Sequence, residues 1–284
     1  MVETLAAEYP VRLLCRVLGL SASSYYYEPT GSDDLSVLVE IEAILAEFPF
    51  YGYRRVAVEL HRRGYAVNRK RVLRLLREND LLRPLRRRVC TTHSERGLGR
   101  YPNLLKGLTV VRPDQVWCAD ITYIQLRRQV AYLAVIIDVF TRSIRGWHLG
   151  ASLSTELVLN ALRGALAKRR PEIHHSDQGV QYAAVGYTEL LRAADVRISM
   201  AGRGRPMENP YAERVIRTIK EEEVVLNEYD TVADARRDIG HFIEVVYQTK
   251  RVHSSLGYLT PAEFEAQWAL EARSFSEGGL DPNL

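Results

Sequence analysis

The apolar positions of the first 80 residues recur at the spacing of an α-helix. Gly19 ends a first helical pattern and Ser21 can cap the next, while Gly64 and Asn68 separate two later helices. The pattern therefore predicts an all-α region that contains a helix-turn-helix. The helices expected in this region span residues 11–18, 22–27, 37–48, 53–63 and 69–79, with a linker at 28–34.

The helix expected at 69–79 has two different faces. Val72, Leu75 and Leu76 form an apolar stripe, and basic side chains project from the opposite side. These basic residues are Lys70, Arg74 and Arg77. A helix that is apolar on one side and basic on the other suits the second helix of a helix-turn-helix lying on DNA. The alternative is a basic face that is merely solvated.

From residue 115 onward the pattern changes to that of β-strands separated by helices. Short connections at 127–128 and 141–142 predict that the first three strands form an antiparallel meander. Asn209 is expected to cap the last helix, with Pro210 in the first turn, where proline is tolerated. The expected order is strands at 115–125, 129–141 and 143–150, helix 155–168, strand 172–176, helix 187–194, strand 196–200 and helix 210–224. This order predicts an α/β fold with a mixed five-stranded sheet and flanking helices.

Composition narrows the class of protein. The 284 residues are 46% hydrophobic and 26% charged, which is typical of a globular chain. The longest apolar run, 132–140, contains Asp138 and is too short to span a bilayer, and the N-terminus lacks a secretory signal pattern. The three cysteines stand far apart, which disfavours a disulfide scaffold or a cysteine-rich zinc site. We therefore expect a soluble, reduced, cytoplasmic protein.

Charge is strongly segregated along the chain, although the net charge is only +4. Residues 1–50 carry 2 basic and 8 acidic side chains, whereas residues 51–100 carry 15 basic and 4 acidic ones. Such a basic block indicates a polyanionic partner, most often nucleic acid. The alternative is an arginine-rich solvated surface, since 34 of the 39 basic residues are arginine.

Three carboxylates could carry chemistry in the second region. Asp120 lies within a strand suited to burial, Asp177 directly follows the short strand at 172–176, and Glu213 begins the second turn of the last helix. Oxygen ligands from two neighbouring strands and a helix suit a hard cation such as magnesium. Two such ions can hold the attacking and leaving oxygens of a phosphodiester in line. Taken singly, each residue could instead be structural: a paired strand aspartate, a turn residue and a surface helix residue.

Several motifs, in order, resemble those of a known family. Between Asp177 and Glu213 lie 35 residues, an interval like that in the acidic triad of transposases and retroviral-type integrases. The chain most closely resembles the second-frame protein (OrfB) of the IS-three family of bacterial insertion sequences, over about residues 10–267. The motifs are YGYRR (51–55), VNRKRV (67–72), YPNLL (101–105), QVWCADITY (115–123), HSDQGVQY (175–182), ENPYAER (208–214), TIKEEE (218–223) and RVHSSLGYLTP (251–261).

The resemblance implies an RNase H-like integrase core in which Asp120, Asp177 and Glu213 are the catalytic metal ligands. The implied cofactor is magnesium, with two ions expected and manganese as a substitute. We expect an N-terminal helical segment at 1–30, a helix-turn-helix DNA-binding domain at 35–95, a connector at 96–112, the catalytic core at 113–226, a C-terminal helical extension at 227–270 and a tail at 271–284. Pro210 departs from the family pattern, where Gly or Ala is commoner.

The residues expected to touch DNA come from both regions. Arg217 and Lys220 share a helical face with Glu213, and in relatives a lysine at the position of Lys220 is thought to contact DNA near the cut. A surface charge pair within the helix is the alternative. The full set of expected DNA contacts is Arg54, Arg55, Arg69, Lys70, Arg74, Arg77, Arg217 and Lys220.

Histidines near the triad suggest other roles. His174 and His175 lack Cys or His partners at metal spacing, so a zinc site is disfavoured, and His175 is expected to orient the loop after its strand. Arg251 and His253 either contact DNA or pin the C-terminal segment, and the sequence leaves both interpretations open.

The resulting hypothesis is a DNA transposase that cleaves transposon ends and transfers the strands to target DNA. Its expected partners are the terminal inverted repeats, target DNA, an upstream-frame protein or fusion, and further copies of itself on the DNA of the nucleoid. One alternative is a DNA-binding regulatory subunit that is catalytically incomplete until fused to the upstream-frame protein. Another is a cellular RNase H-like nuclease or junction resolvase, which would use the same metal chemistry.

Overall fold

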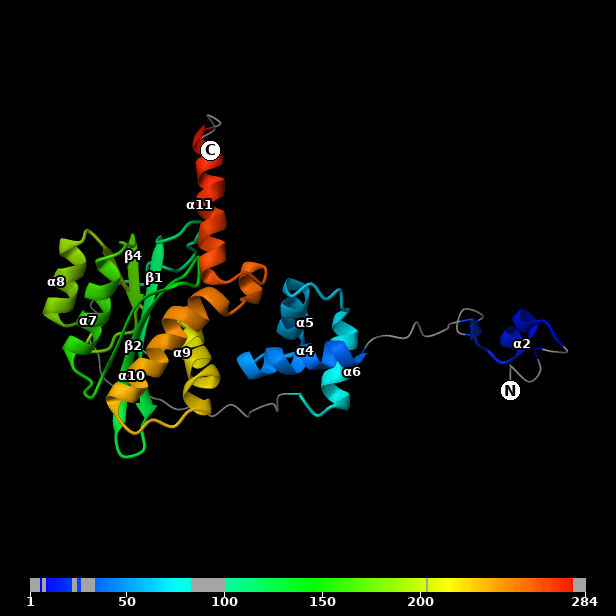
Figure 1. The fold of residues 1–284 in the computed structure, drawn as a ribbon. Coiled ribbons are helices and arrows are strands. Elements are labelled where there is room, and N and C mark those ends of the chain that lie inside the picture. Colours follow the sequence, from blue (N-terminus) through cyan, green and yellow to red (C-terminus); the bar gives the residue numbers. More distant parts are fainter. Residues whose placement is uncertain are drawn as a thin grey trace.

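The computed structural model describes residues 6, 9–21, 25–26, 34–82, 101–202 and 204–277 (Figure 1). The first helix, α2 (Val11–Val17), ends before Gly19, whose φ of +64° is a conformation that glycine adopts readily. The helix expected at 22–27 and the linker at 28–34 fall mainly outside the described residues. Residues 86–88, three arginines that continue the basic block described above, and the first part of the connector lie wholly outside them.

Three helices form the predicted helix-turn-helix region: α4 (Asp34–Glu47), α5 (Tyr53–Arg62) and α6 (Arg69–Glu78). Gly64, with a φ of +89°, follows α5, and the Asn68 side chain caps α6 by accepting a hydrogen bond from the Lys70 N–H at 2.8 Å. Val72, Leu75 and Leu76 are buried, as the apolar stripe predicted. The opposite face of α6 is exposed, so the two-faced helix is confirmed.

The second region is built on a mixed five-stranded sheet. Its strands are β1 (Val116–Gln125), β2 (Val130–Asp138), β3 (Ile144–Gly150), β4 (Ile173–Ser176) and β5 (Arg197–Met200), in the order β3-β2-β1-β4-β5. The first three strands pair antiparallel, and β4 and β5 add in parallel beside β1. The predicted meander and mixed sheet are therefore confirmed, and β2 alone runs against the other four strands, as in an RNase H-like fold.

Helices cover both faces of this sheet (Figure 1). On one face α7 (Thr155–Leu166) and α8 (Val185–Ala193) enclose a core with Trp117 and Ala119. Gly146 of β3 allows α7 to approach, since a Cβ there would lie 2.3 Å from the Ala161 carbonyl oxygen. On the other face lie α9 (Pro210–Glu222) and α10 (Val232–His241), which continues as a π-helical segment (Phe242–Lys250).

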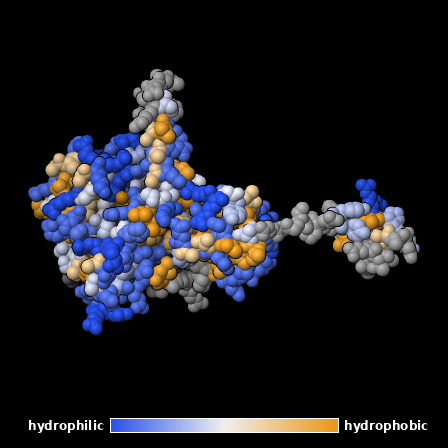
Figure 2. Space-filling model, in the orientation of Figure 1, coloured by the Kyte–Doolittle hydropathy of each residue, from blue (hydrophilic) through white to orange (hydrophobic). Residues whose placement is uncertain are grey.

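The helical region and the sheet region share one hydrophobic core. Phe50 and Phe242 pack edge to face with ring centroids 6.3 Å apart, and the Val252 N–H donates to the Tyr51 hydroxyl at 3.1 Å. In Figure 2 the two surfaces run into each other without interruption. Within the described residues, no helix is long and apolar enough to cross a membrane.

The C-terminal helix is longer than the sequence indicated. Helix α11 (Pro261–Glu277) continues past residue 270, where a tail was expected. Its first turns pack on the sheet region through Phe264 and Trp268, which both contact Phe140. The residues that follow are mostly good helix formers such as Ala, Leu, Glu and Arg, so the helix extends into the region assigned to the tail. Residues 278–284 lie outside the description.

Candidate active site

Asp120 lies in the middle of β1, on the face of the sheet that packs against α9. Alternation along the strand puts it on the same side as Val116 and Cys118, which belong to the core shared with α9. One carboxylate oxygen accepts a hydrogen bond from the Ile121 N–H at 2.8 Å. Its other oxygen accepts none from the described residues, so it remains free for another ligand.

Asp177 follows β4, the strand that pairs with β1 in parallel. The register joins Cys118 to His175, so two residues further along the pair Asp177 lies alongside Asp120. The Asp177 Oδ1 accepts a hydrogen bond from the Gly179 N–H at 2.9 Å. A Cβ at residue 179 would itself lie 2.9 Å from that oxygen, so a larger residue there would displace the Asp177 carboxylate. The predicted placement of the two aspartates on adjacent strands is confirmed.

Glu213 is carried by the first turns of α9, and the start of this helix is tied to β1. Asn209 occupies the N-cap position, as predicted. The prediction that its side chain caps the helix is wrong, because it accepts no hydrogen bond from the first turn. Instead its Nδ2 donates to the Ala119 carbonyl at 3.0 Å, directly before Asp120. Pro210 takes the first position of the helix without disturbing it. Asn209 is thus a positioning residue that the sequence analysis assigned only to capping.

The electrostatics of this cluster are those of crowded like charges. Burial raises the pKa of Asp120 to about 7, and the neighbouring charges of Asp177 and Glu213 add to this rise. Burial also raises the pKa of Asp177. Lys220 partly compensates: its Nζ lies 4.1 Å from the centroid of the Tyr123 ring, and its charge stabilises ionised Asp120. Among the causes that act on Asp120, Lys220 is the cation that opposes the two neighbouring carboxylates.

The donor set of this cluster is chemically suited to a hard divalent cation. All three side chains offer carboxylate oxygens. In Asp120 and in Asp177, one of the two carboxylate oxygens accepts the hydrogen bond described above and the other does not take part in it. In this conformation, no three His, Cys, Asp or Glu side chains of the described residues come close enough together to hold one metal ion. The three carboxylates lie near enough for the charges of Asp177 and Glu213 to raise the pKa of Asp120, and their use as a metal site belongs to the function proposed below.

The two histidines beside Asp177 are structural. His174 and His175 are buried, and burial lowers the pKa of His174 to about 3. The His175 Nδ1 lies 2.8 Å from the Ser199 Oγ, and its Nε2 lies 3.1 Å from the Glu208 carbonyl oxygen. His175 therefore links β4 to β5 and to the turn before α9, in agreement with its expected role in orienting a loop.

The segment after the π-helix is pinned by ion pairs. Arg251 is buried, and its Nη2 lies 2.7 Å from the Glu222 Oε1 at the end of α9. Arg55 of α5 reaches the same oxygen at 3.1 Å. His253 is also buried, and burial together with the neighbouring arginines lowers its pKa to about 2. Of the two interpretations left open for Arg251 and His253, the structure favours pinning.

The other residues expected to contact DNA lie mainly at the surface. On α6, Arg74 pairs with Asp34 at 2.7 Å and with Glu78 at 2.9 Å. Arg69 lies over the Tyr258 ring, 5.6 Å from its centroid. Arg54, Lys70 and Arg77 are exposed, and Arg217 is half-buried on α9. Arg55 alone among the eight is held in an ion pair with a buried partner, Glu222.

Comparison with protein families supports the division into a helical and a sheet region. Residues 32–89 match the HTH-like domain family. Residues 110–206 match one integrase core domain family, and residues 194–261 match a second family of the same description. Together these matches cover both the exposed basic helix α6 and the carboxylate cluster.

Individual relatives match over most of their length. The chain is 34% identical over 267 residues to the uncharacterized 31 kDa protein of insertion element IS600 from Shigella sonnei, covering 90% of this chain and 98% of that protein. It is 36% identical to the transposase of insertion sequence element IS904 from Lactococcus lactis, over 76% and 87% of the two chains. It is 30% identical to the transposase InsF of insertion sequence IS3A from Escherichia coli, over 93% and 96%.

Solved structures give more distant matches. The HTLV-2 integrase catalytic core domain in complex with magnesium is 16% identical and superposes with a TM-score of 0.42, over 53% of this chain and 94% of that one. A simian T-cell lymphotropic virus intasome chain is 16% identical, with a TM-score of 0.46, over 78% and 73%.

Proposed function

Since the chain belongs to the IS-three family of insertion-sequence transposases, we propose that Asp120, Asp177 and Glu213 are the residues with which it cuts the ends of its DNA element and joins them to target DNA. The observation that carries this assignment is the crowding of the three carboxylates. Adjacent parallel strands bring Asp120 and Asp177 together, and the pKa of Asp120 responds to both partners. A stable fold without a functional need for them would pair such charges with cations.

A divalent metal ion resolves this crowding. We propose that Asp120, Asp177 and Glu213 supply oxygen ligands to magnesium, with two ions per site and manganese able to substitute. When bound, such ions activate an oxygen nucleophile and stabilise the leaving oxygen of a phosphodiester. The protein needs no covalent intermediate of its own for this reaction.

The remaining side chains of the site position the reactants. The Asn209 amide holds the start of α9 against β1, which fixes Glu213 relative to Asp120. Lys220 favours the ionised form of Asp120 and presents a cation at the edge of the cluster, where a DNA phosphate would arrive. Arg217 lies on the same side of α9 and extends this basic edge. Both residues were expected from the sequence to contact DNA.

The helical region is proposed to recognise the terminal inverted repeats. The exposed face of α6 offers Arg69, Lys70, Arg74 and Arg77 to a DNA groove or backbone. Arg54 of α5 is exposed next to it, whereas Arg55 serves the ion pair with Glu222. The chain is further proposed to act at the nucleoid, as a homo-oligomer on DNA, with its upstream-frame protein as a partner or fusion.

The experiment that tests this function is metal-dependent joining of a labelled element-end duplex to plasmid. The chain is assayed alone and fused to its upstream frame, each with and without Asp177→Asn. We expect joining that requires magnesium or manganese and disappears in the variant, while binding of the end duplex is retained. Activity that appears only in the fusion would make this chain the catalytic half of a larger enzyme.

Asp195→Asn is the matched control. Asp195 is an exposed turn residue with a φ of +55°, a conformation that asparagine also tolerates, so this variant should join as wild type does. If Asp177→Asn lost both joining and end binding while Asp195→Asn kept both, Asp177 would be structural and the proposed role would be wrong. No joining by either wild-type form, with end binding retained, would favour a regulatory subunit.

A further inference from the structure

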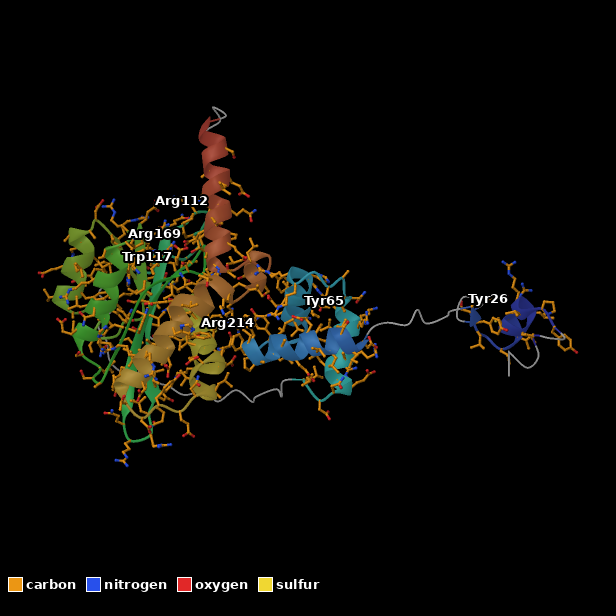
Figure 3. All side chains as sticks on the ribbon, in the orientation of Figure 1. Tyr26, Tyr65, Arg112, Trp117, Arg169 and Arg214 are labelled. Atoms are coloured by element: carbon orange, nitrogen blue, oxygen red, sulfur yellow. The ribbon has the colours of Figure 1, made fainter. Side chains whose placement is uncertain are left out.

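A cavity of about 440 Å³ lies beside α9, where the helical region meets the sheet region. Its volume is in the range of small-ligand sites. Four elements contribute an arginine each to its lining: α5, the β2–β3 turn, α9 and the segment after the π-helix. These residues are Arg55, Arg142, Arg214 and Arg251. In Figure 3 the labelled Arg214 lies toward helices α4 to α6.

The positive charge of this cavity is only partly neutralised. Glu222 pairs with Arg55 and Arg251 from outside the lining, and no carboxylate is among the residues that line the cavity. Arg142 and Arg214 form no ion pair with any residue in the described ranges. A guanidinium group stays protonated at all relevant pH values. The cavity therefore holds an excess of positive charge that nothing in the described chain balances.

Arg142 is held in place at a cost in backbone energy. Its φ of +62° is unfavourable for a side chain larger than glycine, and the Tyr247 hydroxyl donates to its carbonyl oxygen at 3.0 Å. The guanidinium lies 4.4 Å from the centroid of the Tyr211 ring. Its Nη1 is buried and finds no hydrogen-bond acceptor among the described residues. Buried donors are rarely left unpaired, so this nitrogen indicates an absent acceptor.

Uncharged donors complete the lining. Ser254 and Ser255 open a short helix at the mouth of the cavity, and both are exposed. His253 is neutral because burial and the surrounding arginines lower its pKa to about 2, so it adds no charge. Guanidinium groups and hydroxyl groups are both hydrogen-bond donors. Together they suit a phosphate, whose oxygens can accept several hydrogen bonds at once.

We propose that this cavity binds a backbone phosphate of the DNA that the enzyme cuts or joins. The proposal rests on the function given above and adds a DNA contact to it. Arg214 follows Glu213 by one residue, about 100° around α9, so the cavity and the carboxylate cluster flank one exposed stripe of the helix. A DNA strand that crosses this stripe meets Arg217 and Lys220 on one side and the arginine cavity on the other.

The first test measures how salt weakens DNA binding. Arg214→Gln removes an exposed side chain without an ion pair among the described residues, so the fold should be kept. A labelled duplex of arbitrary sequence is titrated with the full chain over a series of salt concentrations. The slope of log affinity against log salt should fall in magnitude by about 0.9, because the variant neutralises one phosphate fewer. Arg142→Gln should give a similar fall, because both residues hold the same phosphate.

Arg197→Gln is the matched control. Arg197 is exposed at the start of β5, beside Ile173 and thus at the opposite end of β4 from Asp177. Its salt slope should equal that of wild type. If Arg214→Gln and Arg197→Gln had the same slope, the cavity would not bind phosphate. If Arg214→Gln changed the oligomeric state measured by sedimentation without DNA and left the salt slope unchanged, the cavity would be a contact between protein chains.

The second test locates the phosphate. Single neutral methylphosphonate linkages are placed along an element-end duplex. At one position the linkage should weaken binding by wild type but not by Arg214→Gln, and such non-additivity marks a direct contact. The absence of any such position would overturn the proposal. If neither the chain nor its fusion to the upstream frame joined DNA, yet this pattern were kept, the catalytic function would be wrong and the phosphate site would stand.

Discussion

Two groups of carboxylates on the same sheet differ in how their charge is balanced. Asp114 and Asp138 lie near the start of β1 and the end of β2, and Arg145 reaches both, at 2.8 Å and 4.0 Å. Asp138 also accepts hydrogen bonds from the N–H groups of Asp114 and Thr141, both at 2.7 Å. Asp120 lies further along β1, and Asp177 directly follows β4. Each accepts one hydrogen bond from a backbone N–H.

This difference separates a group whose charge is balanced within the fold from the group proposed above to act in catalysis. Both Asp120 and Asp138 have a raised pKa because they are buried, so neither burial nor the direction of the shift distinguishes them. The number of protein donors and cations does. A carboxylate whose needs are met within the fold contributes stability, whereas one left unbalanced is available to a ligand from outside. Three experiments test this contrast.

The largest effect is expected from Arg145→Gln. Arg145 is 7% exposed and also pairs with Glu265 at 2.6 Å, so the change removes a buried cation from the buried Asp138 and from the partly buried Asp114 and Glu265. Breaking a buried pair in this way should lower the free energy of unfolding by about 3–5 kcal/mol. Urea unfolding measures the loss. Arg169→Gln is the control, because Arg169 pairs with the same Asp114 at 3.2 Å but is 52% exposed, and it should cost less than about 1 kcal/mol. Equal losses would show that the Asp114 group is not balanced by Arg145.

The second effect concerns pH. The pKa of Asp120 is raised from 3.8 to about 7 by burial and by the charges of Asp177 and Glu213. Between those values the folded chain keeps a proton that the unfolded chain has released. The stability of the metal-free protein should therefore fall as pH rises from about 4 to about 7, by on the order of 2 kcal/mol. Urea unfolding of wild type and Asp120→Asn at both ends of this range isolates the contribution, since the variant lacks it. A parallel pH dependence in the two proteins would place the ionisation elsewhere.

The smallest effect is stabilisation by metal. At a magnesium concentration ten times its dissociation constant, wild type should gain about 1.4 kcal/mol against unfolding. Asp120→Asn should gain much less at the same concentration, because one ligand is neutral. Thermal unfolding at pH 8 with magnesium, and with potassium at matched ionic strength, measures the gain. A similar gain in both proteins would mean that the ion binds outside the carboxylate cluster.

Much of the fold was accessible from local pattern. Spacing and turn residues predicted three features that are all present. They are the two faces of the helix at 69–79, the meander of the first three strands and the proline at the start of α9. Asp120 and Asp177 were also expected on neighbouring strands, and they are. Local pattern alone does not separate Asp120 from Asp138, because both are strand aspartates in apolar surroundings.

What the sequence did not reveal depends on contacts between distant residues. Arg55 and Glu222 are 167 positions apart, and the basic character of Arg55 alone suggested DNA rather than an internal ion pair. Asn209 had the residue type and position of a helix cap, yet its amide reaches the neighbouring strand. The arginine cavity draws on four separate elements, and no local pattern relates their positions.

The ion pairs of Glu222 with Arg55 and Arg251 have a consequence for where the DNA is cut. They join α5 of the helical region to the last turn of α9, the helix that carries Glu213. Together with the shared hydrophobic core, these ion pairs tie the two regions directly to each other. Under the proposed function, the sequence bound by α6 and the bond cut at the carboxylates would then be separated by a set number of nucleotides. Inserting base pairs between them in an end substrate should then move the cut along the sequence instead of stretching the protein.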